Sequence, residues 1–91
     1  MAVEPYTTEE VKTLLEINRF TKQALLDRIV IIETLIAYGE KLRYEIVHML
    51  VSEETFNRWR TEPGAAEAEI VKLREEIAKI EGEITDLEAQ L

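Results

Sequence analysis

The last third of the chain carries an unbroken heptad pattern of aliphatic residues, which constrains the fold more than any other feature. Isoleucine or leucine recurs at alternating spacings of three and four, at Ile70, Leu73, Ile77, Ile80, Ile84, Leu87 and Leu91. On a helix about 40 Å long, these residues form one continuous apolar stripe. Because such a stripe is unfavourable in water, we predict that residues 65–91 form a coiled-coil helix. The heptad stripe, as we call these seven residues, is the predicted interface with another helix.

Acidic side chains flank the heptad stripe. Residues 61–91 carry a net charge of −6, whereas residues 1–60 carry −2. In a parallel homodimer Glu76 would face Glu81, and Glu83 would face Glu88. Each repulsion costs a few tenths of a kcal/mol, less than the roughly 1.5–3 kcal/mol from burying one Ile or Leu. The sequence is therefore compatible with a homo-oligomer, and this acidic flank is expected to favour basic surfaces on a protein partner.

A helical hairpin is the other arrangement that fits the heptad stripe. The run Thr61-Glu62-Pro63-Gly64 is the clearest stop signal in the chain. Counting outward from a turn at residues 63–64 sets the C-terminal helix against residues 36–50, with Ile77 near Leu50, Ile84 near Arg43 and Leu91 near Ile36. Both arrangements are all-α, a helical bundle or a helical hairpin with a C-terminal coiled-coil helix. In both we expect self-association.

Residues 1–62 are expected to form a helical domain before the turn at 63–64. Thr7 and Glu10 fit a capping box that starts a helix at Thr8, and neither glycine nor proline occurs between Pro5 and Gly39. Farther along this helix, Leu25, Ile29, Ile32 and Ile36 share one face. Ile31 and Leu35 widen it enough for contacts on more than one side. We predict helices over about 8–38, 40–50 and 52–61, the last capped by Ser52.

The sequence contains few residues suited to catalysis or metal binding. It has no cysteine, one histidine, one serine and three isolated glycines, which excludes a disulfide, a thiolate metal site and a glycine-rich phosphate loop. Glu45 and His48 form a Glu-x-x-His pair, but no further carboxylate ligands can be assigned to it. We therefore predict a protein that is not an enzyme and has no cofactor and no metal.

No stretch of the sequence is typical of a membrane protein. The longest strongly apolar run is only four residues, Ile29–Ile32, and Glu33 follows it. The N-terminal residues lack the basic start and the apolar region of a signal peptide. The sequence therefore predicts a soluble, intracellular protein that does not contact membranes.

The stretch YEIVHMLVSEETFNRWR, residues 44–60, resembles the helix-turn-helix of transposase subunits, small terminase subunits and bacterial regulators, whose pattern reads EIA..LGVS..T..RW. Ser52 matches the N-cap of the second helix, and the buried positions of the motif are matched by Ile46, Leu50, Val51, Phe56 and Trp59. The resemblance implies that Arg58 and Arg60 reach phosphates, with Thr55 and Asn57 near base edges. Followed by a zipper-like segment, the motif also resembles the small protein of some insertion elements.

Several features of this stretch favour protein binding over DNA binding. The glycine of the pattern is missing before Val51, and Val47 replaces a small alanine. Glu53 and Glu54 place carboxylates where phosphates would approach. Residues 41–60 carry a net charge of only +1, whereas binding by phosphate neutralisation needs several well-placed bases. We therefore expect a helical oligomerisation or protein–protein interaction module, an assembly or adaptor protein. The alternative is an oligomeric helix-turn-helix DNA-binding protein of phage or mobile-element type.

Overall fold

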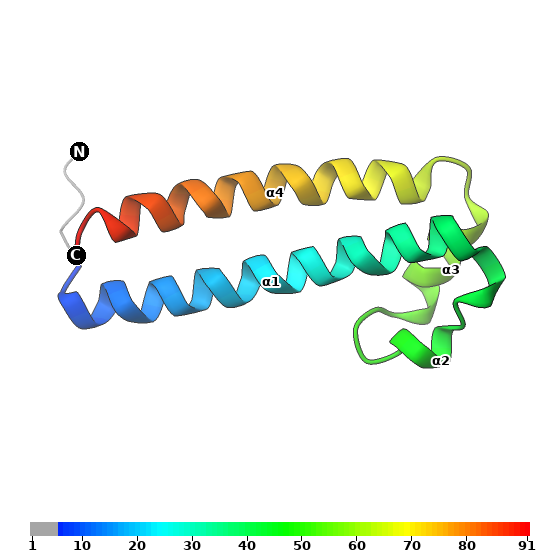
Figure 1. Cartoon of the computed structure of the whole chain (residues 1–91), viewed down its shortest axis with the longest axis horizontal. Coiled ribbons are helices and arrows are strands. Elements are labelled where there is room, and N and C mark those ends of the chain that lie inside the picture. The colour runs from blue at the N-terminus through cyan, green and yellow to red at the C-terminus, as the bar shows by residue number, and fades with distance from the viewer. Residues whose placement is uncertain (1–5) are drawn as a thin grey trace.

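Two long antiparallel helices form the body of the molecule, and shorter helices form a lobe at one end of it (Figure 1). The computed structural model describes residues 6–91; residues 1–5, the start of the predicted helical domain, lie outside the described residues. Helix α1 spans Thr8–Tyr38 and α4 spans Ala65–Glu88; between them lie η1 at Gly39–Lys41, α2 at Tyr44–Val47 and α3 at Glu53–Thr61. Residues 6–91 contain no strand. The prediction of an all-α helical hairpin is confirmed.

The capping box predicted at the start of α1 is confirmed. The Thr7 backbone N–H donates to Glu10 Oε1 at 3.0 Å, and the Glu10 backbone N–H donates to Thr7 Oγ1 at 3.2 Å. The first of these bonds, helped by the Thr7 side chain, lowers the pKa of the Glu10 carboxyl. At its other end α1 stops at Gly39, whose φ of 56° is a conformation that residues with a Cβ rarely adopt.

The segment from 40 to 50, predicted as one helix, has a different structure. It contains the short η1, two extended residues at Leu42 and Arg43, and the single turn of α2. This irregular path buries Leu42, Val47 and Val51, and the Tyr44 hydroxyl donates to the Val51 carbonyl at 2.9 Å. Burial of these three side chains therefore outweighs the helical preference of the local composition.

Helix α3 begins and ends close to where the sequence predicts. Ser52 is its N-cap, with Oγ accepting from the Thr55 backbone N–H at 3.2 Å. After α3 the chain turns at Gly64, whose φ is 78°, and α4 begins at the next residue. We call residues 39–61 the lobe, because they lie to one side of the hairpin that α1 and α4 form (Figure 1).

Helix α4 runs back along α1, and its register differs from the one counted from the sequence. Arg19 Nη2 lies 3.1 Å from Glu88 Oε2, and Lys22 Nζ lies 3.7 Å from Glu81 Oε2. The end of α4 is thus beside the first half of α1, not beside residues 36–50. The counted register assumed that the chain before the turn continues as a straight helix. Instead the lobe folds aside, so α4 meets α1 directly.

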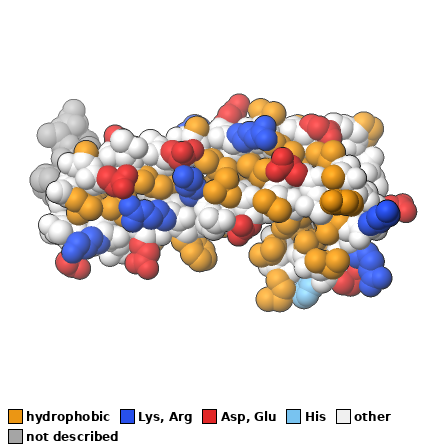
Figure 2. All heavy atoms as spheres, viewed as in Figure 1, with side chains coloured by type: hydrophobic (Ala, Val, Ile, Leu, Met, Phe, Trp, Pro, Cys, Tyr) orange, Lys and Arg blue, Asp and Glu red, His pale blue; other side chains and the backbone are white. Residues whose placement is uncertain are grey.

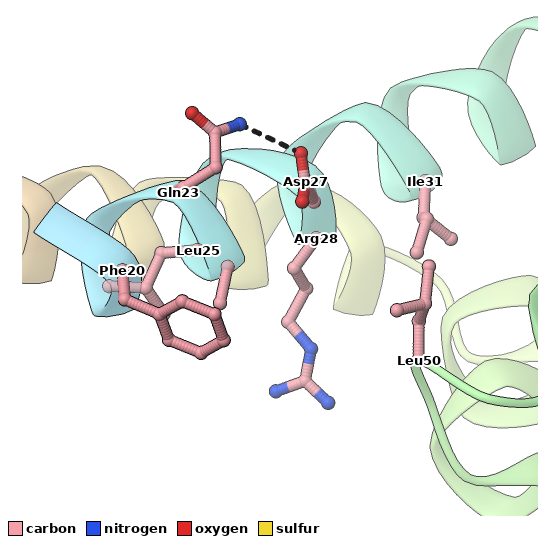
Figure 3. Close-up of a pocket in the computed structure, with 8 residues that line it drawn as sticks. Phe20, Gln23, Leu25, Asp27, Arg28, Ile31 and Leu50 are labelled. Atoms are coloured by element: carbon pink, nitrogen blue, oxygen red, sulfur yellow. Dashed lines mark hydrogen bonds between the residues drawn. The ribbon is translucent and has the colours of Figure 1, made fainter. Parts of the chain in front are cut away.

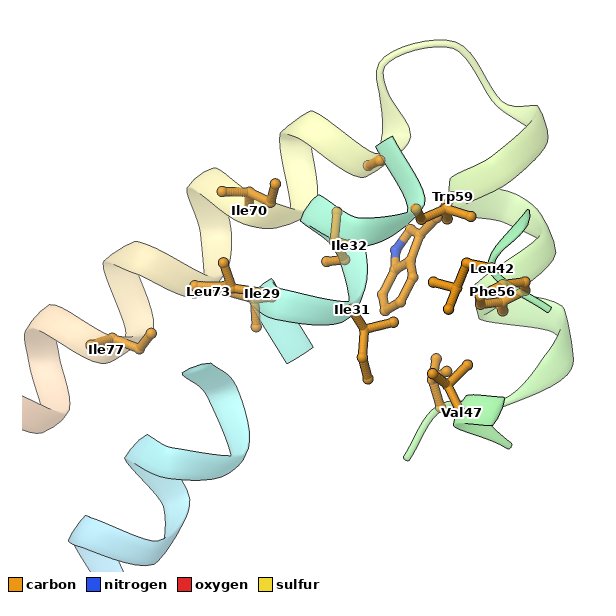
Figure 4. Packing of buried hydrophobic residues seen from close by; sticks show 13 residues of the cluster. Ile29, Ile31, Ile32, Leu42, Val47, Phe56, Trp59, Ile70, Leu73 and Ile77 are labelled. Carbon is orange, nitrogen blue, oxygen red and sulfur yellow. The ribbon is translucent and has the colours of Figure 1, made fainter. Parts of the chain in front are cut away.

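Two clusters of buried side chains hold the helices together. The larger cluster joins α1, the lobe and α4, and contains Ile29, Ile31, Ile32, Leu35, Leu42, Val47, Val51, Phe56, Trp59, Ala66, Ile70, Leu73 and Ile77. Figure 4 shows Ile29 on the α4 side of α1 and Ile31 directed towards the lobe. The smaller cluster joins Val11 and Leu15 to Leu87. The expected second contact side of α1 at Ile31 and Leu35 is therefore present.

Candidate protein interaction surface

Most of the heptad stripe packs against α1 of the same chain. Ile70, Leu73, Ile77 and Leu87 are buried, and Ile80 and Ile84 are half-buried. Leu91 lies beyond the end of α4 and is 64% exposed. A helix, α1, therefore covers most of the heptad stripe and removes it from water. Since that helix belongs to the same chain, the stripe is largely unavailable to a separate partner.

The acidic flank is also partly occupied within the chain. Glu88 and Glu81 pair with Arg19 and Lys22 of α1, while Glu83 is exposed and Glu76 is half-buried. Because both ion pairs are open to solvent, each contributes at most about 1 kcal/mol to folding. Two of the four acids therefore have bases beside them before any partner binds.

The stretch with helix-turn-helix resemblance has only part of the expected burial. Phe56, Trp59 and Val51 are buried, as the motif implies. Ile46 and Leu50, which match buried positions of the motif, are instead exposed. The physical reason is that α2 is a single turn of four residues, too short to cover α3 as the first helix of the motif does.

The four residues assigned to DNA contact lie on α3 and differ in exposure. Asn57, Arg58 and Arg60 are exposed, and the Arg60 guanidinium carbon lies 5.3 Å from the centroid of the Phe56 ring. Thr55 is half-buried, and its hydroxyl oxygen accepts a hydrogen bond from Ser52 Oγ at 2.9 Å. The exposed residues therefore form a polar face, while Thr55 has a structural role at the start of α3.

Exposed apolar side chains occur on α1 and on the lobe. Phe20 of α1 is 79% exposed and Met49 of the lobe is 84% exposed, and Ile17, Ile46 and Leu50 are also exposed. In the space-filling view, hydrophobic side chains cover the protruding tip of the lobe beside the histidine (Figure 2). Where such side chains adjoin to form a contiguous patch, they commonly mark a surface that binds another molecule.

A groove of about 340 Å³ lies between these two apolar regions, and is lined by Phe20, Gln23, Ala24, Leu25, Asp27, Arg28, Ile31 and Leu50. In Figure 3, the Arg28 side chain extends between Phe20 and Leu50, and its guanidinium carbon lies 5.4 Å from the centroid of the Trp59 ring. Gln23 Nε2 donates to Asp27 Oδ1 at 2.9 Å at the rim. Both ends of the groove, at Phe20 and Leu50, are apolar, which suits packing against another helix.

The sequence analysis did not identify the exposed apolar residues of α1 as part of an interaction surface. Ile17, Phe20 and Ala24 follow a spacing of three and four, and the same helical face continues to Ile31 and Leu35. We call these five residues the α1 stripe. The spacing is a usable signal, but polar residues beside it obscure the pattern before residue 25.

The described residues contain neither a cluster of metal ligands nor a membrane span. Glu45 and His48 are both exposed, and Glu45 Oε2 lies 3.6 Å from Arg43 Nε. Within residues 6–91, no group of three His, Cys, Asp or Glu side chains is placed to hold a metal ion. No helix in this part of the chain is long and apolar enough to cross a bilayer. No family model, curated protein or solved structure matches the chain.

Proposed function

We propose that this protein is a helical oligomerisation and protein–protein interaction module that has no enzymatic activity. The supporting observation is the exposed Phe20 beside an apolar groove whose far end is Leu50. The heptad stripe supports the hairpin from within, while the groove side of α1 is open to another chain. The protein would thus act by presenting a rigid helical surface, as assembly and adaptor proteins do.

The energetics of the surface favour this proposal. Burying one large apolar side chain that was exposed contributes roughly 1.5–3 kcal/mol. Ile17, Phe20 and Leu50 lie at or beside the groove, so a partner helix that covers all three gains several kcal/mol before the cost of association. Three of the eight residues that line the groove are polar, and two of these, Gln23 and Asp27, already hydrogen-bond to one another, which limits the desolvation cost of binding there.

DNA binding is less well supported. The single turn of α2 and the exposed Ile46 and Leu50 depart from the packing of a helix-turn-helix. Two carboxylates, Glu53 and Glu54, occupy the first turn of α3. The chain as a whole carries a net charge of −8, which repels a phosphate backbone. The exposed acids of α4, including Glu83, favour basic protein surfaces instead.

Sedimentation equilibrium over a wide range of chain concentrations tests the proposal. The wild-type chain should associate, and Phe20→Glu should shift the association to higher concentration. Val30→Glu is the matched control, because Val30 lies on the same helix at 59% exposure but outside the groove. Circular dichroism should show the same helix content for all three proteins.

Two results would contradict the proposal. One is a wild-type chain that remains monomeric at every concentration. The other is a shift in the mobility of random duplex DNA that salt weakens and that Arg58→Glu with Arg60→Glu removes. The second result would assign the chain to the DNA-binding class that residues 44–60 resemble.

A further inference from the structure

The lobe covers only the C-terminal part of the α1 stripe. Ile31 and Leu35 are buried, and Arg28 lies against Trp59 of the lobe. Towards the N-terminus the same helical face is bare, with Ile17 and Phe20 exposed. From Glu9 to Arg28 this bare face is about 29 Å long at 1.5 Å per residue. It is therefore a helix-length surface that stops where the lobe begins.

We propose that a second copy of this chain occupies the bare face, with its α1 packed antiparallel to the first α1 about a two-fold axis between Ile17 and Phe20. The inference rests on the proposed oligomerisation function and names the partner and the geometry. The dimer it describes has a four-helix body, made of two α1 helices at the centre and one α4 on each outer side.

The position of the lobe selects the antiparallel direction. In a parallel pair both lobes would project from the same end of the dimer towards one another, because each lobe lies at the C-terminal end of α1 (Figure 1). In an antiparallel pair each lobe lies beyond the N-terminal end of the partner's α1. The bare face then matches the length of the helix that covers it. Leu50 at the edge of the lobe borders the groove and faces that helix end.

The charges along the bare face favour antiparallel over parallel pairing of two copies. The N-terminal end of the bare face carries the acids Glu9 and Glu10, both exposed, and the other end carries Asp27 and Arg28, whose formal charges cancel. Parallel pairing would bring the acids of the two copies together. Antiparallel pairing instead sets Glu9 and Glu10 of each copy opposite Arg28 and Asp27 of the other, so that one attraction and one repulsion occur at each end and the meeting of four acids is avoided. The neighbouring Asp27 already accepts a hydrogen bond from Gln23.

The side chains along the bare face also match under this symmetry. With Glu9 opposite Arg28, Ile17 faces Phe20 of the second copy and Thr13 faces Ala24. The two large apolar residues thus meet at the centre, where burial is greatest, and smaller residues meet on either side. Spacings of three or four residues keep these side chains on one side of α1, where they can pack against a facing helix.

Cysteine cross-linking tests the geometry directly, because the chain has no cysteine of its own. Two single variants, Thr13→Cys and Ala24→Cys, are made with tags of different mass, mixed, unfolded, refolded together and mildly oxidised. The proposal predicts a disulfide-linked dimer that contains one copy of each variant. Each variant oxidised alone should give little linked product. Val30→Cys, on another side of α1, is the control for chance collision.

The outcomes separate the geometry from the function. Linked dimers of Thr13→Cys with itself, or of Ala24→Cys with itself, would mean parallel pairing and would overturn the inference. The inference would also be overturned if the dimer that links Thr13→Cys to Ala24→Cys were no more abundant than the linked dimer formed by the Val30→Cys control. If the same chains still associate in sedimentation, the proposed function stands and only this dimer fails. A chain that is monomeric throughout would overturn both.

Discussion

Arg19 Nη2 lies 3.1 Å from Glu88 Oε2, although 69 residues separate the two along the chain. The contact joins the first half of α1 to the last turn of α4. It therefore shows which parts of α1 and α4 face one another. The Lys22–Glu81 pair, one turn of α1 farther on and two turns of α4 earlier, agrees with this antiparallel alignment.

This contact marks the register but should contribute little to stability. The side chains of Arg19 and Glu88 are 57% and 52% exposed, and exposed ion pairs typically contribute about 0–1 kcal/mol. Arg19→Ala should therefore lower the free energy of unfolding by less than about 1 kcal/mol. Urea denaturation at low and high salt measures this, and the effect should shrink as salt screens the pair. A loss several times larger would show that the pair is less solvated than the structure indicates.

Leu73 and Leu91 both belong to the heptad stripe, but their different burial predicts unequal effects of alanine substitution on the free energy of unfolding. Leu73 is 2% exposed, so Leu73→Ala should cost about 2–5 kcal/mol through lost burial and a cavity. Leu91 is 64% exposed, so Leu91→Ala should change the free energy of unfolding by less than about 0.5 kcal/mol. Chemical denaturation of both variants tests the contrast. Similar losses at both positions would indicate a coiled coil that uses the whole stripe.

The two glycines Gly39 and Gly82 should respond to alanine in opposite directions. Gly39 has a φ of 56°, so Gly39→Ala forces a strained backbone and should cost about 1–3 kcal/mol. Gly82 lies within α4 with open space around the site of a new Cβ, so Gly82→Ala should raise stability by up to about 1 kcal/mol. Thermal unfolding compares the two. If Gly39→Ala were neutral, α1 would continue past residue 39 in solution.

The capping box predicts a pH dependence at the start of α1. The Thr7 backbone N–H, together with its side chain, lowers the pKa of the Glu10 carboxyl in the folded chain. A lowered folded-state pKa means that Glu10 stabilises the fold above its unfolded pKa. This contribution is lost as the pH falls through the folded pKa. The stability difference between wild type and Glu10→Gln should therefore be largest near neutral pH and disappear in acid.

Removal of the other partner tests the same box independently of pH. Thr7→Ala removes the acceptor for the Glu10 backbone N–H and should cost about 1 kcal/mol, as loss of an N-cap does. Thr8→Ala, one residue inside the helix, is the matched control and should be nearly neutral. Equal effects of the two substitutions in urea denaturation would argue against the cap.

The sequence predicts the helices well because their signals are local. Thr7 with Glu10, Ser52 and Gly64 each sit at a helix end, and the structure has caps or a turn at these positions. The heptad stripe is also a local signal, since its spacing requires a covering helix. What a local pattern does not specify is which helix provides the cover.

The sequence does not identify α1 as the partner of the heptad stripe, because the side of α1 that packs against α4 is not uniformly apolar. Asn18 and Lys22 lie between the two buried clusters, and both are half-buried. Asn18 donates to its own helix at the Leu14 carbonyl, and Lys22 reaches Glu81. These two polar residues interrupt the spacing that would have identified α1 as the partner.

The irregular path of the lobe is also not specified by local sequence signals. Residues 41–50 have a helical composition, yet Leu42, Val47 and Val51 reach the core only if the chain bends. This gain in burial depends on α1 and α3 being present, so it does not appear in the propensity of the segment alone. The same bend exposes Ile46, Met49 and Leu50, and so creates part of the proposed interaction surface.

In the structure α4 folds back onto α1 of its own chain, which leaves Ile17 and Phe20 of the α1 stripe exposed. Spin labels attached to Arg19→Cys and Glu88→Cys in one chain test this pairing, since the exposed Arg19–Glu88 pair is expected to contribute little to folding. Strong spin–spin broadening is expected, and it should persist when the labelled chain is mixed with an excess of unlabelled chain and refolded. Broadening that disappears on this dilution, or that is absent from the start, would mean that α4 pairs with another molecule or projects alone.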